Sequence, residues 1–163
     1  MSTPEYERWT ALAVRTPSDV RTEPGGPVPL TWQMNKLQEH SERLSNIALP
    51  VDFPYEVERG TAEDALAGLA LRTSLLRDLE AQGGSRIHEA ALLGATWTEI
   101  GAALGLSAHE ARQELLAWAA GQHRLYLHDM QDGREPSFGF THEQHAAVLA
   151  LTELGDDEGV HSG

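Results

Sequence analysis

The chain has 163 residues, a formal net charge of −13 at pH 7 and no cysteine. This length suits one domain, and the lack of cysteine excludes disulfides, a thiolate nucleophile and cysteine-ligated zinc. No apolar run is long enough for a transmembrane helix, and the N-terminal residues lack the pattern of a secretory signal. We therefore expect a soluble cytoplasmic protein with no membrane partner.

Residues 1–30 are predicted to form a flexible N-terminal segment. Thr3 and Pro4 are suited to start a short helix, with Thr3 as its N-cap. Residues 16–30 hold a Gly-Gly pair and four of the eight prolines, which is typical of a linker.

Residues 31–152 are predicted to form a helical domain. A first helix covers 31–49, with Trp32, Leu37, Leu44 and Ile47 as its apolar candidates. Pro50 and Pro54 then impose an extended connection that places Phe53 and Tyr55 on the core.

A long amphipathic helix is predicted over 61–82, ended by Gly83 and Gly84, with a short helix starting at Ser85. Residues at three- and four-residue steps predict its buried face: Ala62, Ala65, Leu66, Leu69, Thr73, Leu76 and Leu79.

Three Ser/Thr residues are followed three positions later by Glu or Gln: Thr96-Glu99, Ser107-Glu110 and Thr141-Gln144, with Thr61-Asp64 as a weaker variant. In such a capping box the hydroxyl accepts from a free amide of the first turn, and the acid or amide reaches back to the cap residue. The boxes predict helices starting at 97, 108 and 142. No stretch alternates convincingly as a strand does, so the predicted fold is all-α.

The last residues, 153–163, are acidic, contain glycine and are almost free of apolar side chains. This composition predicts a disordered acidic tail.

Residues 95–117 predict a helix-turn-helix. Gly101 is the small residue that such a motif needs where its helices cross, and Gly105 suits the positive φ of the turn. Ser107 caps the second helix. The buried side is supplied by Ile100, Leu104, Leu106, Ala111 and Leu115.

The stretch "GATWTEIGAALGLS", residues 94–107, resembles the helix-turn-helix of small actinobacterial DNA-binding proteins related in shape to sigma-factor region 4. In these proteins a Trp-x-Glu-Ile-Gly-x-Ala-Leu-Gly-x-Ser core follows a long amphipathic helix. The resemblance covers residues 62–116 and is looser after Ser107, where relatives tend to carry Arg and Gln. It implies sequence-specific DNA binding in transcriptional regulation.

On a recognition helix starting at 108, the groove-facing residues would be Ser107, Ala108, His109, Arg112, Gln113 and Leu116. Arg112 suits a guanine edge, Gln113 an adenine edge and Ala108 a thymine methyl group. His109 is suited to hydrogen-bond a base or a phosphate. Four further residues are candidates for phosphate contacts: Thr96, Thr98, Arg86 and Arg124.

The charge predicts modest affinity for double-stranded DNA from one copy of the motif. Between 94 and 121 the only formal cation is Arg112, against Glu99, Glu110 and Glu114. Phosphate contacts supply much of the affinity of DNA-binding proteins. A homodimer would double these contacts and read two half-sites.

The alternative is a protein–protein adaptor that uses the same helical surface without binding DNA. A surface salt bridge to an acid one turn away is as good an explanation of Arg112 as a base contact. The second helix of the motif is predicted to continue to residue 130. Its apolar residues suit either packing or a dimer interface: Leu115, Leu116, Trp118, Ala119, Tyr126, Leu127 and Met130.

No catalytic residue, cofactor or metal site is predicted. The chain has no phosphate-binding loop, dinucleotide-binding glycine pattern or nucleophile elbow. His142 and His145 are three residues apart, whereas zinc proteases place their histidines four apart on a helix. The sequence therefore predicts a protein that is not an enzyme.

Overall fold

The structure, a computed structural model, describes Glu7 and residues 11–22, 26–136 and 138–160. It is built from helices, apart from an antiparallel pair of two-residue strands, β1 (Arg21–Thr22) and β2 (Gly26–Pro27). The chain divides into two compact units, an N-terminal unit (Met1–Ala81) and a C-terminal unit (Gln82–Gly163). Helix α3 (Ala62–Leu92) contributes to both.

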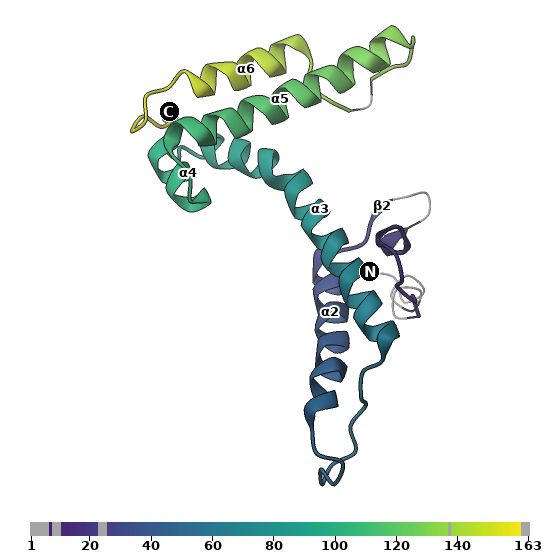
Figure 1. The fold of residues 1–163 in the computed structure, drawn as a ribbon. Coiled ribbons are helices and arrows are strands. Elements are labelled where there is room, and N and C mark those ends of the chain that lie inside the picture. The colour runs from purple at the N-terminus through teal and green to yellow at the C-terminus, as the bar shows by residue number, and fades with distance from the viewer. Residues whose placement is uncertain (1–6, 8–10, 23–25, 137, 161–163) are drawn as a thin grey trace. The chain divides into compact units, whose positions relative to one another are not determined.

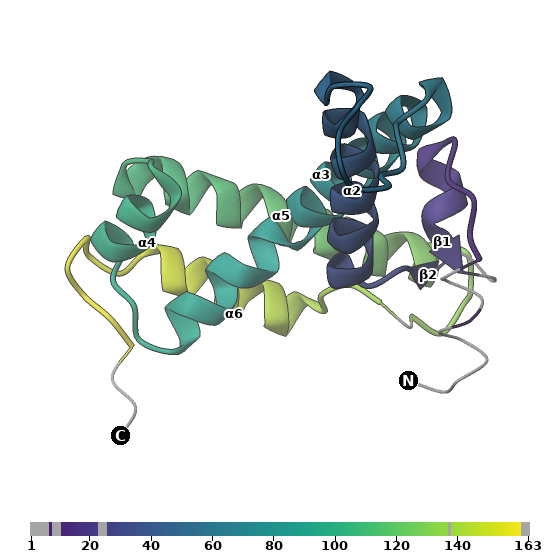
Figure 2. The same ribbon diagram turned by 90° about the horizontal axis from the view of Figure 1, so that it is seen from below.

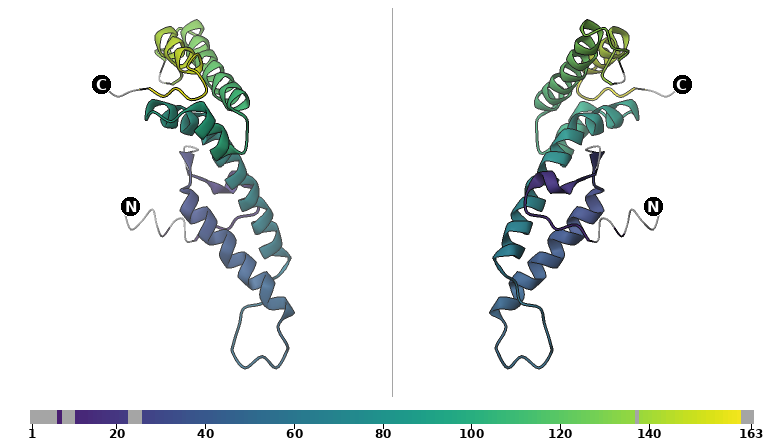
Figure 3. Two further views of the ribbon diagram at one scale, coloured as in Figure 1. Left: turned by 90° about the vertical axis from the view of Figure 1, so that its left-hand side faces the viewer. Right: turned by 90° about the vertical axis from the view of Figure 1, so that its right-hand side faces the viewer.

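In the N-terminal unit, α2 (Leu30–Ser45) and the first half of α3 run side by side in opposite directions (Figures 1 and 3). A 3₁₀ turn, η2 (Asn46–Ala48), ends α2, and the predicted connection follows, starting with a turn in which the Phe53 amide donates to the Pro50 carbonyl oxygen at 3.2 Å. Tyr55 is 73% exposed, so the prediction that it lies on the core is wrong. Its ring instead meets that of Phe53 edge-on at 5.8 Å.

The predicted N-terminal segment contributes to the core of this unit. Residues 17–20 form a 3₁₀ helix, η1 (Pro17–Val20), whose N-cap is Thr16. Val14, Val20 and Val28 are buried against α3, so residues 14–22 and 26–28 are more than a flexible linker. Residues 3–6 and 8–10 of the short helix predicted from Thr3 lie outside the described residues, Glu7 is helical, and residues 11–15 are not helical.

The buried face of α3 differs from the predicted one. Four predicted core leucines, Leu66, Leu69, Leu76 and Leu79, are 50–63% exposed. The buried side chains in this part of α3 are Asp64, Ala67, Ala70, Leu71, Ser74 and Leu75. Small residues let a neighbouring helix approach closely, so Ala67 and Ala70, with Leu71, form the face that packs on Trp32 and Leu37.

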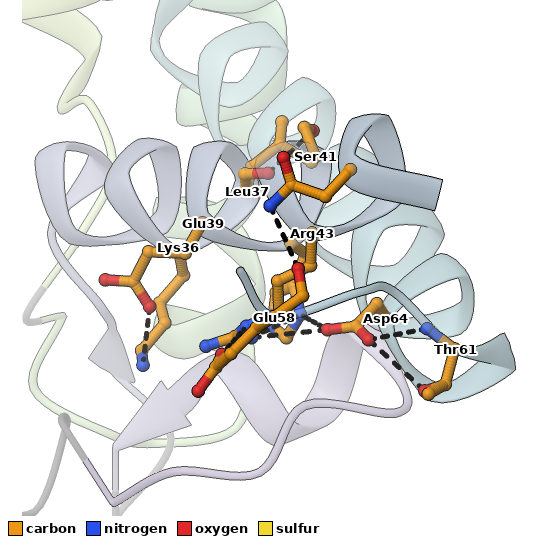
Figure 4. A network of polar contacts seen from close by, with 10 residues as sticks. Lys36, Leu37, Glu39, Ser41, Arg43, Glu58, Thr61 and Asp64 are labelled. Atoms are coloured by element: carbon orange, nitrogen blue, oxygen red, sulfur yellow. Dashed lines mark hydrogen bonds and ion pairs between the residues drawn. The ribbon is translucent and has the colours of Figure 1, made fainter. Parts of the chain in front are cut away.

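A polar network joins the start of α3 to α2 (Figure 4). Asp64 accepts hydrogen bonds from the Thr61 amide at 2.8 Å and from His40 Nδ1 at 2.8 Å, and it lies 3.2 Å from Arg43 Nη1. Arg43 also pairs with Glu58 at 2.7 Å. The hydrogen bond from His40 is the main reason why the pKa of Asp64 lies far below its usual range, and the Thr61 amide adds to it. The network fixes the first turn of α3.

Helix α3 continues through Gly83 and Gly84, where the sequence predicts a break. A Cβ atom on Gly84 would overlap the side chain of Trp118, whereas one on Gly83 would have no neighbour within 4 Å. Gly84 therefore serves helix packing in the C-terminal unit, which local sequence rules do not anticipate.

The C-terminal unit contains the end of α3, then α4 (Trp97–Leu104), α5 (Ala108–Gln131) and α6 (His142–Thr152). All three predicted starts, at 97, 108 and 142, are confirmed, each with both hydrogen bonds of its capping box. Helices α5 and α6 lie antiparallel and side by side (Figures 1 and 2). The core of the C-terminal unit is formed by residues of α4, α5 and α6, among them Trp97, Ile100, Ala111, Leu115, Ala119, Val148 and Leu151.

Candidate nucleic-acid interface

The turn between α4 and α5 brings the two helices into direct contact. Gly105 ends α4 in the left-handed region, at φ +69°, and Ser107 begins α5 as its N-cap. A Cβ atom on Gly101 would lie 2.8 Å from the Leu106 carbonyl oxygen and 3.1 Å from the Ala108 amide nitrogen. Because real Cβ atoms do not approach so closely, only glycine at 101 allows the start of α5 to lie against α4.

Trp97 anchors the α4–α5 pair to the core of the C-terminal unit. This side chain is 2% exposed, and its Nε1 donates to the Leu151 carbonyl oxygen of α6 at 2.9 Å. Ala111 and Leu115 present the buried side of α5 to the same core. The outer side of the first turns of α5 is thereby held rigidly toward solvent.

Two of the predicted groove-facing residues, His109 and Gln113, are exposed on α5. Ala108 is half-buried against the core, and Leu116 is half-buried. Ser107 is exposed, but its hydroxyl accepts from the Glu110 amide at 3.1 Å. The structure thus leaves a smaller free surface than the sequence predicts.

Arg112 points away from a free groove and into the chain itself. Its Nη1 lies 2.6 Å from Asp156 Oδ1, and its Nη2 donates to the Leu154 carbonyl oxygen at 2.7 Å. The guanidinium also lies 5.3 Å from the centre of the Trp97 ring, within the range of a cation–π contact. Only 15% of the Arg112 side chain is exposed. Arg112 therefore forms a salt bridge, but its partner is Asp156 and not an acid one turn away on the same helix.

Three of the predicted phosphate-binding residues, Thr96, Thr98 and Arg86, are also engaged, whereas Arg124 is exposed on α5. The Thr98 amide donates to the Asp156 carbonyl oxygen at 2.9 Å, and its hydroxyl donates to Asp157 Oδ1 at 2.8 Å. Thr96 is the N-cap of α4, with its hydroxyl 3.2 Å from the Glu99 amide. Arg86, on α3, pairs with Glu89 at 2.8 Å.

The contacts of Arg112 and Thr98 come from the predicted disordered tail. Residues 154–158, here called the covering segment, form a turn in which the Glu158 amide donates to the Gly155 carbonyl oxygen at 3.1 Å. The composition of this stretch predicts disorder, but its acidic and carbonyl oxygens find donors on α4 and α5. The sequence signal for this pairing is weak: a run of acids after α6 and one arginine far from it. Residues 161–163 lie outside the described part of the chain.

The surface around the pair is acidic. The amide and hydroxyl of Thr96 lower the pKa of Glu99, and those of Ser107 lower the pKa of Glu110. Glu99, Glu110 and Glu114 are all exposed. The lowered pKa values keep Glu99 and Glu110 negatively charged at neutral pH, close to the exposed side of α5.

An apolar groove lies between the end of α3 and α4 in the C-terminal unit. Its volume is about 240 Å³, and it is lined by Gly83, Arg86, Ile87, Ala90, Ile100, Ala103 and Leu104. Leu104, on its edge, is 45% exposed. A groove of this kind suits an apolar side chain of a partner.

The apolar continuation of α5 is mostly used inside the C-terminal unit. Leu115 and Ala119 are fully buried, and Trp118 packs edge-on against Phe140 with ring centres 5.2 Å apart. Met130, at the end of the helix, is 53% exposed. Leu116, Tyr126 and Leu127 are half-buried, so part of the surface that the sequence offers to a dimer through α5 remains.

The histidines near the start of α6 pack against α5. His123 stacks on His145 with ring centres 4.7 Å apart and meets His142 edge-on at 4.6 Å. Within the part of the chain that the structure describes, no group of three or more His, Asp or Glu side chains is placed to hold a metal ion. Among the described residues, no helix is both long and apolar enough to cross a membrane.

Comparison of the chain with protein-family models, with curated proteins and with solved structures gives no match. The resemblance of residues 94–107 to actinobacterial DNA-binding proteins therefore stays a prediction.

Proposed function

We propose that α4 and α5 form a helix-turn-helix that binds double-stranded DNA, with α5 as the recognition helix, and that the protein regulates transcription. The close approach of the start of α5 to Gly101 carries this proposal. A helix-turn-helix holds its two helices at a fixed angle through a short turn, so that the N-terminal residues of the second helix reach base edges. The capped start of α5 and its exposed His109 and Gln113 meet that need.

The affinity of this interface is expected to be modest. Arg112 is the only cation between residues 94 and 121, and it is paired with Asp156. With few cations to contact phosphates, binding has a shallow dependence on salt and depends mainly on base contacts. Gln113 is suited to an adenine edge, and His109 to a base or a phosphate.

The test selects bound fragments from a random duplex library at salt concentrations of about 50 and 150 mM. His109→Ala/Gln113→Ala is compared with the intact chain, because Arg112→Ala would also remove contacts that hold the covering segment. We expect an enriched motif that the double variant binds at least about fivefold more weakly, given about 1–3 kcal/mol for a good base contact.

The matched control is His128→Ala/Gln131→Ala, which makes the same chemical change roughly 27 Å further along α5, at a rise of about 1.5 Å per residue. Both of these residues are exposed. Equal loss in the two double variants, or no enrichment at either salt concentration, would contradict the proposal.

The apolar groove between α3 and α4 favours a second candidate, a protein–protein adaptor. Under this candidate an apolar side chain of a partner enters the groove beside Ala103 and Leu104. Leu104→Asp should then abolish capture of that partner, while His109→Ala/Gln113→Ala should leave it unchanged. A variant at Leu104 that alters DNA selection alone would count against the adaptor.

A further inference from the structure

We infer that the covering segment is an autoinhibitory element, which closes the proposed DNA-binding surface by occupying Arg112 and Thr98 in cis. This inference rests on the proposed function, because it concerns the regulation of the same surface. DNA and the covering segment then compete for the same donors.

The covering segment offers α4 and α5 the same kind of group as a DNA backbone does, namely oxygen atoms that accept hydrogen bonds. The segment presents only acceptors: the Asp156 and Asp157 carboxylates and the Leu154 and Asp156 carbonyl oxygens. The partners on α4 and α5 are all donors: the Arg112 guanidinium and the amide and hydroxyl of Thr98. Phosphate oxygens in a complex with DNA would satisfy these same donors.

Thr98 lies at the start of α4, where backbone amides are free to bind a phosphate. It is the second residue of α4, and the first amides of a helix have no partner within the helix. In a helix-turn-helix the first helix crosses the DNA backbone. The Asp156 carbonyl oxygen, 2.9 Å from the Thr98 amide, therefore fills a place where a phosphate oxygen is expected.

The acidic part of the segment can be released separately, because Leu154 packs against the core whereas Asp156 and Asp157 are exposed. The Asp156 side chain is 62% exposed, and solvent and salt weaken such an ion pair. The bond from Trp97 to the Leu151 carbonyl oxygen lies before the segment in the chain and does not depend on it. Further on, Gly159 packs against the carbonyl oxygen of Gly94, where a side chain would not fit.

If the protein binds DNA only when the segment is open, its apparent affinity equals the intrinsic affinity multiplied by the fraction of molecules in the open state. The experiment compares the full chain with Asp156→Asn/Asp157→Asn, using a mixed-sequence duplex of about 30 base pairs at about 50 mM salt. We expect the variant to bind about tenfold more tightly.

Removing two negative charges also reduces general repulsion of DNA. The control is therefore Glu135→Gln/Glu143→Gln, which removes two charges from exposed side chains away from α4 and the start of α5. We expect this control to change the affinity less than about twofold, because screening acts over about 10 Å at 0.1 M salt.

Hydrogen exchange at the Thr98 amide gives a second, direct readout. Its bond to the covering segment predicts protection in the intact chain and at least about tenfold faster exchange in Asp156→Asn/Asp157→Asn. The amide of Ile100, which bonds to the Thr96 carbonyl oxygen within the helix, should be unchanged.

The outcomes separate the two proposals. Tighter binding and faster Thr98 exchange in the variant alone support autoinhibition. Equal binding by all three proteins overturns autoinhibition and leaves the DNA-binding proposal standing. If no protein binds the duplex while Thr98 exchange still rises in the variant, the DNA-binding proposal falls, and the covering segment is only a structural clasp.

Discussion

Gly83 and Gly84 are neighbours in α3, but only Gly84 lies under another side chain. A Cβ atom there would overlap Trp118, whereas Gly83 has open space. We expect Gly84→Ala to lower the free energy of unfolding by about 1–3 kcal/mol, because the indole has to move. Gly83→Ala should raise it by about 0.5 kcal/mol, because alanine reduces the freedom of the unfolded chain. Urea titration checks both, and destabilisation by both would contradict this account of α3.

For single residues, the sequence predicts roles that depend on the local backbone, but it does not predict contacts with residues far away in the chain. Gly101 and Gly105 were predicted from spacing, since a close helix crossing and a left-handed turn are local needs. Arg112 was proposed for a base edge, but its partner Asp156 lies 44 positions away and is invisible to local rules. Of the predicted site residues, the structure leaves His109 and Gln113 as the exposed pair on α5.

The helices of the C-terminal unit begin where their capping boxes are. A serine or threonine cap contributes about 1 kcal/mol to stability. We expect Ser107→Ala to lower the free energy of unfolding by about that amount and to raise amide exchange in the first turn of α5. Ser85→Ala, whose exposed hydroxyl bonds to the Gln82 carbonyl oxygen within α3, should cost much less. A similar loss of unfolding free energy in both variants would contradict the stabilising role assigned to the Ser107 cap.

The Asp64 network at the start of α3 predicts a dependence of stability on pH. The folded-state pKa of Asp64 is lowered, mainly by its hydrogen bond from His40. The contribution is therefore present above the usual carboxyl range, about pH 4, and is lost as the pH falls through the folded-state pKa. Asp64→Asn should lower the urea midpoint at pH 7 and reduce its fall between about pH 5 and 3.

The control for this pH dependence is Asp52→Asn, at an exposed position in the extended connection. It should leave both the midpoint and its pH dependence close to those of the intact chain. An unchanged pH profile in Asp64→Asn would contradict the role assigned to this carboxylate.

Helix starts could be predicted because a capping box is complete within four residues. The buried face of α3 could not be predicted, because its leucines and its alanines both repeat with helical spacing. Which stripe is buried depends on the neighbouring α2, where close packing favours Ala67 and Ala70 over Leu66 and Leu69. The same limit applies to the covering segment, whose composition is that of a disordered tail although its oxygens have partners.

The molecule as a whole was predicted as one helical domain with loose ends, whereas the contacts divide it into two units within α3. We expect the units to unfold in separable steps, since each has its own core. The indole NMR signals of Trp32 and Trp97 report one unit each during urea unfolding. Asp64→Asn should shift the transition of Trp32, and Gly84→Ala that of Trp97. Coincident shifts of both signals in either variant would contradict this division.

The central claim, that the α4–α5 pair binds DNA and has to displace the covering segment, is tested most directly by NMR. A mixed-sequence duplex is added to the isotope-labelled intact chain, and the shifts of its backbone amide signals are mapped. We predict changes at His109 and Gln113, where bases are contacted, and at Thr98, Asp156 and Asp157, where the segment is released. Unchanged signals at these five residues, with or without changes along the α3–α4 groove, would contradict the claim.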